Sequence, residues 1–212
     1  MSNRLQDMYR LLLETFGPQH WWPGDTPLEI MVGAVLTQNT NWQNVEKAVT
    51  NLREAGFLTF DKLAGLPSEV LAEQIRPCGY YNLKAGRLLN LLRFIQQEYD
   101  NLEDFLAQEI NDLRRELLSV KGIGPETADS ITLYAANQPS FVVDTYTVRV
   151  LIRHQFLAED EADYHFVRDM FMDSLPLDSA LFNEYHALLV RLGKDFCRKS
   201  KPRCAECPLK DF

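Results

Sequence analysis

The sequence has few cysteines and no long apolar run. Four cysteines in 212 residues are too few for a disulfide framework, and three of them, Cys197, Cys204 and Cys207, cluster near the end of the chain as metal ligands do. No stretch reaches the roughly 18 consecutive apolar residues of a membrane-spanning helix. The first residues also lack the basic-then-apolar layout of a secretory signal. We therefore expect a soluble, cytoplasmic protein that has no membrane partner.

The sequence also lacks an excess of basic residues. It has 22 Lys and Arg against 30 Asp and Glu, a formal net charge of −8, so any contact with a polyanion must be local. The stretch from Arg191 to Phe212 is the exception, because seven basic residues there outnumber three acidic ones. This local reversal of charge predicts one surface that faces a polyanion.

Strand-like alternation is nearly absent, and apolar residues recur at spacings of three and four along most of the chain. This pattern predicts an all-α fold of about ten short helices, with Asp144 and Ser179 as N-caps. The expected helices lie in 28–52 (two helices, joined by a polar turn at Thr37–Asn44), 68–75, 83–99, 102–110, 111–119, 127–137, 145–156, 162–175 and 179–192.

The segment LLSVKGIGPETA, from Leu117 to Ala128, predicts two helices joined by a tight hairpin. Gly122 and Gly124 let the backbone approach another molecule closely, and Pro125 suits the first position of the second helix. The N–H groups at such a helix start can bind a phosphate. The segment is therefore typical of a clamp on a DNA backbone, although an ordinary corner between two helices has the same glycines.

Twenty residues beyond Gly124, the segment PSFVVDTYTVRVL places Asp144 at the start of an amphipathic helix. A capping role would explain an isolated aspartate at this position.

A GxG hairpin followed at this distance by a VDT aspartate resembles the HhH-GPD superfamily of DNA glycosylases, the endonuclease III group. VLTQNT (Val35–Thr40), GYYNLKA (Gly79–Ala85) and the terminal cysteine loop match in the same order. The resemblance implies a monomer that binds double-stranded DNA containing a damaged base. It also implies two domains, a six-helix barrel at 25–135 that ends in the hairpin, and a domain made of 1–24 and 136–212 with the cysteine loop.

The resemblance implies roles for individual residues. Asp144 would stabilise the positive charge that develops on the sugar as the N-glycosidic bond breaks. Gln38 would fill the gap that the extruded base leaves in the DNA stack. Contacts of the hairpin with DNA would come from Lys121, Gly122, Gly124 and Thr127.

The chain departs from the bifunctional members of this superfamily at one position. Those enzymes carry a nucleophilic lysine two residues after the second hairpin glycine, where this chain has Glu126. A carboxylate cannot form an imine with the sugar, so we predict a monofunctional enzyme that uses water and leaves an abasic site. Lys121 is the alternative amine.

Trp21, Trp22 and Trp42 are the only tryptophans and lie close together in the sequence. Core filling would explain each of them singly. The segment WWPGDTPLEIMVGAVLTQNTNW, however, resembles the 3-methyladenine DNA glycosylase III branch, which implies that Trp42 and one of the other two sandwich an alkylated purine. Electron-rich indoles favour such a cationic base. The alternatives are a glycosylase for oxidised or deaminated bases and a non-catalytic DNA-binding module.

The terminal loop, Cys197-x6-Cys204-x2-Cys207, resembles the endonuclease III loop that holds a 4Fe-4S cluster on four cysteines. The fourth ligand would fall at position 213, beyond Phe212. The open alternatives are a truncated sequence, an incompletely ligated or lost cluster, a zinc ion with His186 as the fourth donor, or a loop without metal. Cys78 is a weaker fourth candidate. Lys194 is either a surface lysine or a residue near the base pocket.

Overall fold

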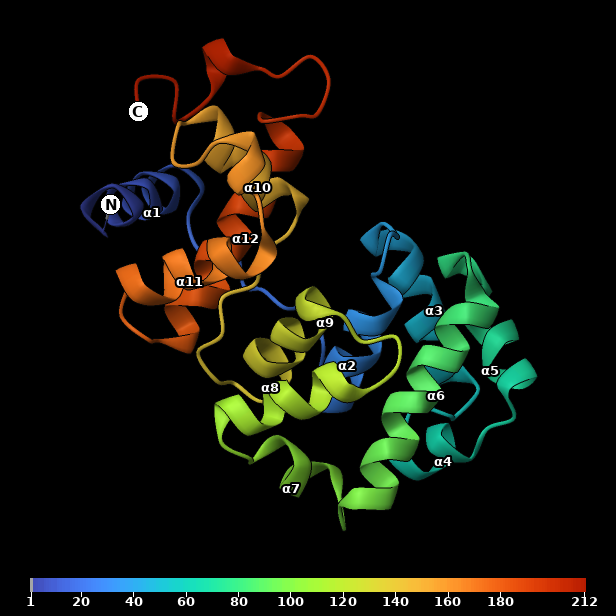
Figure 1. Ribbon diagram of the computed structural model, residues 1–212. Helices are drawn as coiled ribbons and strands as arrows, with labels where there is room; N and C mark the ends of the chain where they lie inside the picture. Colours follow the sequence, from blue (N-terminus) through green and yellow to red (C-terminus); the bar gives the residue numbers. More distant parts are fainter. Residues whose placement is uncertain (1) are drawn as a thin grey trace. The chain divides into compact units, whose positions relative to one another are not determined.

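The computed structural model describes residues 2–212, and this part of the chain contains helices and no β-strand (Figure 1). The predicted all-α fold class is therefore confirmed. Contacts within the chain divide it into two compact units. The terminal unit consists of the residues up to Trp22 together with Pro139–Phe212, and the central unit is Pro23–Gln138. No helix in residues 2–212 is both long and apolar enough to cross a membrane.

The central unit is built around one strongly apolar helix. Its elements are α2 (Pro27–Leu36), α3 (Trp42–Glu54), α4 (Phe60–Gly65), α5 (Ser68–Gln74), η1 (Arg76–Cys78), α6 (Tyr81–Glu98), α7 (Leu102–Leu106), α8 (Ile110–Ser119), α9 (Pro125–Ser130) and η2 (Ile131–Ala135). Helix α2 is buried on nearly every side, as its almost uninterrupted apolar sequence requires. Its start is fixed by Thr26, whose hydroxyl accepts a hydrogen bond from the Glu29 N–H at 3.2 Å.

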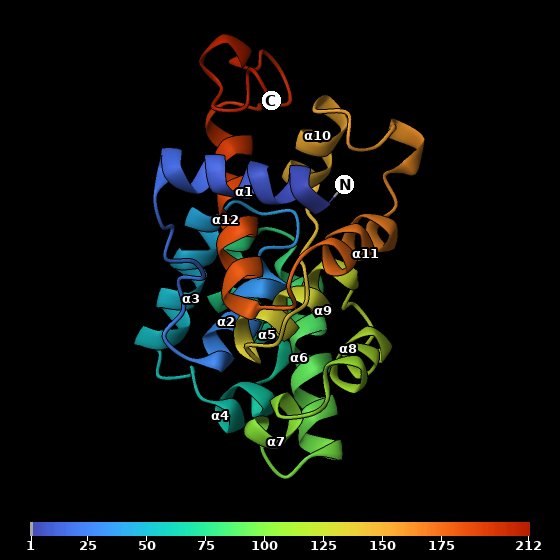
Figure 2. The ribbon, with the colours of Figure 1, turned by 90° about the vertical axis from the view of Figure 1, so that its left-hand side faces the viewer.

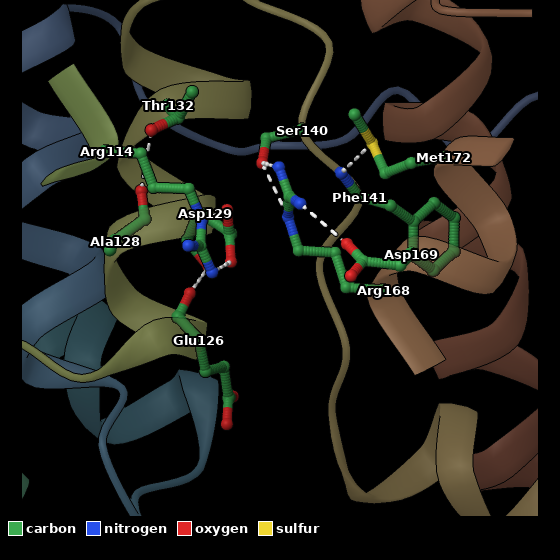
Figure 3. A network of polar contacts seen from close by, with 11 residues as sticks. Arg114, Glu126, Ala128, Asp129, Thr132, Ser140, Phe141, Arg168, Asp169 and Met172 are labelled. Carbon is green, nitrogen blue, oxygen red and sulfur yellow. Dashed lines mark hydrogen bonds and ion pairs between the residues drawn. The ribbon is translucent and has the colours of Figure 1, made fainter. Parts of the chain in front are cut away.

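A buried ion pair joins α8 to α9, the two helices that flank the hairpin (Figure 3). Arg114 Nε and Nη2 donate to the two carboxylate oxygens of Asp129 at 2.8 and 3.0 Å. The Asp129 side chain is fully buried, and that of Arg114 is 16% exposed. Such a two-point contact fixes distance and orientation together, so it sets how the two helices meet.

The terminal unit packs α10 and α12 against each other and lays α1 across α12 (Figure 2). Its elements are α1 (Ser2–Phe16), α10 (Thr145–Arg153), η3 (Glu159–Glu161), α11 (Tyr164–Ser174), α12 (Ser179–Asp195) and η4 (Cys204–Glu206). The buried rings of Phe141 and Phe171 stack with centroids 3.7 Å apart. The hydroxyl of buried Tyr185 donates to the Leu5 carbonyl at 2.8 Å, which ties α12 to α1.

A second polar contact in the terminal unit holds the segment that leads to Asp144. Arg168 on α11 donates from Nε and Nη2 to the hydroxyl of buried Ser140, at 3.3 and 3.1 Å (Figure 3). Its Nη1 also lies 3.1 Å from the Asp169 carboxylate. The run Phe141–Val143 is buried directly after Ser140. Asp144 therefore follows a segment that is held by the contact of Ser140 with Arg168 and by the burial of its next three residues.

Several predicted helix positions need correction. The described residues form twelve α-helices rather than about ten, because α1 and α4 were not predicted. The N-cap of α12 is Asp178, whose carboxylate accepts from the Leu181 N–H at 3.0 Å, so the assignment to Ser179 is wrong. The helix expected at 102–110 ends early as α7, where the Gln108 side chain donates to the Phe105 carbonyl at 2.9 Å.

Candidate functional site

The hairpin between α8 and α9 has the conformation that its glycines predict. Gly122 has a φ of +101°, a value that favours glycine, and the side-chain stem of Arg87 occupies the place where its Cβ would lie. The Ile123 N–H donates to the Val120 carbonyl at 3.0 Å and closes the turn. Pro125 opens α9, while Lys121 and Gly124 are exposed. The hairpin therefore exposes Gly124 to solvent, while Gly122 is only partly exposed.

The turn between α2 and α3 lies against this hairpin. Gln38 in this turn donates from Nε2 to the Gly122 carbonyl at 3.2 Å and to the Thr127 hydroxyl at 3.0 Å. Thr127 is buried, so its hydroxyl supports the hairpin from within. The structure thus joins two of the predicted motifs, the VLTQNT turn and the glycine hairpin, in the central unit.

A buried lysine that the sequence motifs did not single out holds the same turn. Lys84 is 1% exposed, and its ammonium donates to the carbonyls of Leu36 and Cys78 at 2.8 and 3.0 Å and to the Thr40 hydroxyl. Burial lowers the pKa of Lys84. The GYYNLKA motif contains this lysine, but nothing in the sequence says which oxygens it reaches.

Tyr80, in the same motif, is also a missed candidate. Its side chain is 76% exposed, and its φ of +46° is unusual for an aromatic residue. Exposed large apolar side chains are few among the described residues, and Leu83, one helical turn further, is another. An exposed aromatic ring can stack on a flat partner.

Asp144 caps α10 in the terminal unit, as predicted. Its Oδ1 accepts from the Thr147 N–H at 2.7 Å, and its Oδ2 lies 3.7 Å from His186 Nε2 on α12. Burial raises the pKa of Asp144, but the interactions with His186 and Thr147 outweigh it, so the pKa lies below the ordinary value of an aspartate. The site therefore holds an ionised carboxylate in a largely dry place.

His186 is a second residue whose place the sequence did not reveal. From the sequence, His186 was a candidate only as a fourth metal donor. In the structure it is 5% exposed and faces Asp144, from which it is separated by 42 positions along the chain. In the sequence, only its place among the apolar positions of this helix indicated that His186 would be buried.

The three tryptophans are divided between the two units. Trp21 and Trp22 belong to the terminal unit and contact each other edge to face, with ring centroids 5.5 Å apart. Trp42 starts α3 in the central unit and packs partly on its core. All three are partly exposed. The Lys194 ammonium lies 5.8 Å from the centre of the Trp21 ring, close enough for a cation–π contact.

The terminal cysteine loop is fastened to α10 by two arginines. Arg149 Nε donates to the Cys197 carbonyl at 2.6 Å, and Arg153 Nη1 lies 3.3 Å from the Cys197 sulfur. Burial, with smaller contributions from Cys197 and Cys204, raises the pKa of the Cys207 thiol.

Residues 2–212 contain no group of three or more His, Cys, Asp or Glu side chains placed to hold a metal ion. His186 faces Asp144, and the buried Cys78 thiol contacts the Asn44 carbonyl at 3.4 Å in the central unit. The cluster stays a prediction, which iron and acid-labile sulfide analysis of the purified protein would test.

Comparison with known proteins identifies the family. The HhH-GPD superfamily of base excision DNA repair proteins matches residues 32–174. A Methanocaldococcus jannaschii protein named as a DNA repair glycosylase is 46% identical over 97% of this chain and 93% of its own length.

Two solved structures are also similar. The H. pylori 3-methyladenine DNA glycosylase MagIII, bound to 1,N6-ethenoadenine, is 29% identical, with a TM-score of 0.76 over 91% of this chain and 96% of that chain. An endonuclease III–DNA complex shares the fold, with a TM-score of 0.84 and 23% identity over 100% of this chain and 94% of that chain. The chain therefore belongs to the HhH-GPD superfamily and is a DNA glycosylase of base excision repair.

Proposed function

We propose that this DNA glycosylase is monofunctional and removes alkylated purines such as 3-methyladenine from double-stranded DNA. The observation that carries this proposal is the likeness to the H. pylori 3-methyladenine enzyme over nearly the whole chain. The three partly exposed tryptophans support it. Indole rings attract an electron-poor, cationic base by stacking, which requires few hydrogen bonds.

In the proposed mechanism, Asp144 supplies the electrostatic stabilisation. Cleavage of the bond between sugar and base builds positive charge on the sugar, and an ionised carboxylate in a dry site stabilises that charge more in the transition state than in the ground state. The lowered pKa of Asp144 keeps the carboxylate charged. Water then attacks the sugar, and the product keeps an intact strand with an abasic site.

The proposed DNA contacts come from the hairpin and the turn beside it. The exposed Lys121 and the glycine backbone at Gly122 and Gly124 would hold a phosphate. Gln38 would fill the position of the extruded base. Thr127 would act indirectly, because its buried hydroxyl accepts a hydrogen bond from Gln38.

The absence of strand cleavage follows from Glu126, which is exposed at the position of the lyase lysine. We expect borohydride to trap no covalent complex of the wild-type protein with abasic DNA, and Glu126→Lys to give a trapped complex because the new amine can form an imine. Denaturing gels score the adduct, and Glu126→Gln is the matched control that adds no amine. A wild-type adduct that disappears in Lys121→Gln would instead make Lys121 the nucleophile.

The pairing of Asp144 with His186 predicts the pH dependence. The pKa of Asp144 is depressed, so the carboxylate stays charged as the pH falls through the usual range for aspartate. His186→Gln removes the interaction with His186 that lowers the pKa of Asp144, so this pKa rises. The acidic limb of the pH–rate profile for base release then moves to higher pH.

Tyr185→Phe is the matched control for this measurement, since it removes a buried hydrogen bond of the same helix to Leu5 without touching Asp144. We expect its acidic limb to coincide with that of the wild type. An acidic limb that stays in place in His186→Gln would show that His186 does not act on the carboxylate.

A panel of duplexes tests the substrate class. Single-turnover rates of base release would be compared for methylated DNA, a duplex with uracil and a duplex with an oxidised pyrimidine. We expect the methylated purines to be released fastest. Faster release of uracil or of the oxidised base would replace the proposed specificity by an endonuclease III-like one, and binding without any release would indicate a non-catalytic module.

A further inference from the structure

Three segments of the central unit meet at the amide of Gln38. The first is the turn after α2, which carries Gln38, and the second is the hairpin, where Gly122 and Thr127 accept hydrogen bonds from Nε2. The third is α6, from which Arg87 Nη1 donates to Gln38 Oε1 at 2.5 Å. These partners lie 49 to 89 positions from Gln38 along the chain.

The chemistry of the partners determines which way this amide points. Arg87 has only donors, so it must face the amide oxygen, and the Gly122 carbonyl has only acceptor capacity, so it must face the amide nitrogen. Both amide hydrogens and the oxygen are used. The Gln38 side chain is therefore held in one orientation, with its nitrogen toward the hairpin.

Arg87 also supports the hairpin backbone directly. Its aliphatic stem lies where a Cβ of residue 122 would be, so any larger residue at this position would collide with the arginine. One turn further along α6, Asn90 Nδ2 donates to the Lys121 carbonyl at 3.0 Å. The carbonyls of Lys121 and Gly122 are thus both bound by protein donors, on the side of the hairpin that faces α6 and the turn.

From this geometry, and resting on the proposed function, we propose that Arg87 is a positioning residue that couples the hairpin to Gln38. A phosphate held by the hairpin then fixes where Gln38 enters the gap left by an extruded base. Without the Arg87 guanidinium, the hairpin can still contact DNA, but the Gln38 amide loses the charge-assisted hydrogen bond that orients it.

The test compares the affinity for a duplex that contains a reduced abasic-site analogue with the affinity for the same duplex undamaged, by fluorescence anisotropy. The abasic duplex offers an empty base position without requiring base release. We expect the wild type to prefer it, and Arg87→Met to lose about tenfold of that preference while the affinity for undamaged DNA changes by less than about twofold. Arg87→Lys, which keeps one donor, should recover part of the preference.

Two comparisons separate coupling from a general loss of structure. Arg93→Met removes an exposed arginine of the same helix and should leave both affinities unchanged. In a double-mutant cycle, Arg87→Met should have little further effect once Gln38→Met is present. The proposal would be overturned if the two substitutions had additive effects in the cycle, or if Arg87→Met lost affinity equally for the abasic and the undamaged duplex. A wild type that does not prefer the abasic duplex would overturn it as well.

The proposed function can fail independently of this coupling. If the wild type releases no base from methylated DNA, the substrate assignment is wrong, while the two affinities still measure the link between Arg87 and Gln38. If base is released but Arg87→Met behaves like Arg93→Met, the coupling alone is wrong.

Discussion

Asp144→Asn is expected to slow base release at least about 100-fold while DNA binding stays near the wild-type level. Asparagine has nearly the same shape as aspartate but no charge, so it cannot stabilise the cationic sugar of the transition state. It is also as good an N-cap as aspartate, so the hydrogen bond from the Thr147 N–H can remain and α10 keeps its start. Single-turnover rates and DNA affinities would be measured in parallel.

Asp178→Asn provides the matched control for the capping role. Asp178 caps α12 in the same way, through the Leu181 N–H at 3.0 Å, but its side chain is exposed. We expect wild-type rates from this variant. If Asp144→Asn released base as fast as the wild type, the carboxylate would not be the catalytic group. If neither the wild type nor Asp144→Asn released base, the result would favour a non-catalytic binding module.

The second large effect concerns stability rather than catalysis. Asp129→Asn is expected to lower the free energy of unfolding by about 3 kcal/mol, because it leaves the largely buried Arg114 guanidinium without its opposite charge. The effect is large because the pair joins α8 to α9 and the Asp129 carboxylate is fully buried. Denaturant unfolding followed by circular dichroism would measure it.

A neighbouring pair on α8 gives the control for this variant. Arg115 Nη1 and the Asp112 carboxylate are 2.5 Å apart, but both side chains are more than half exposed. Asp112→Asn should therefore cost no more than about 1 kcal/mol. Equal losses from Asp129→Asn and Asp112→Asn would show that the buried pair does not hold the hairpin helices together.

The sequence predicted the features that depend on residues close together along the chain. The apolar spacing located α2, α3 and α6, and the two glycines with Pro125 located the hairpin. Leu5, Met8 and Leu12 of α1 have helical spacing and are buried, so the same reasoning could have found that helix. The Asp178 cap was missed because Asp and Ser stand side by side there and both are good N-caps.

The contacts that shape the candidate site could not be predicted in this way. Lys84 and His186 act on groups that are distant along the chain, and no local pattern encodes which partner a buried polar side chain will meet. The bond between Arg87 and Gln38 likewise depends on how α6 packs against the hairpin. Tertiary packing supplies this information, and only the structure contains it.

One reaction tests the central claim most directly. Purified wild-type protein would be incubated with methylated duplex DNA, the released bases would be identified by chromatography, and the DNA would be run on a denaturing gel before and after alkali. A monofunctional alkylpurine glycosylase predicts free methylated purine and strand breaks only after alkali. No released methylpurine would contradict the substrate assignment, and breaks before alkali would contradict the monofunctional mechanism.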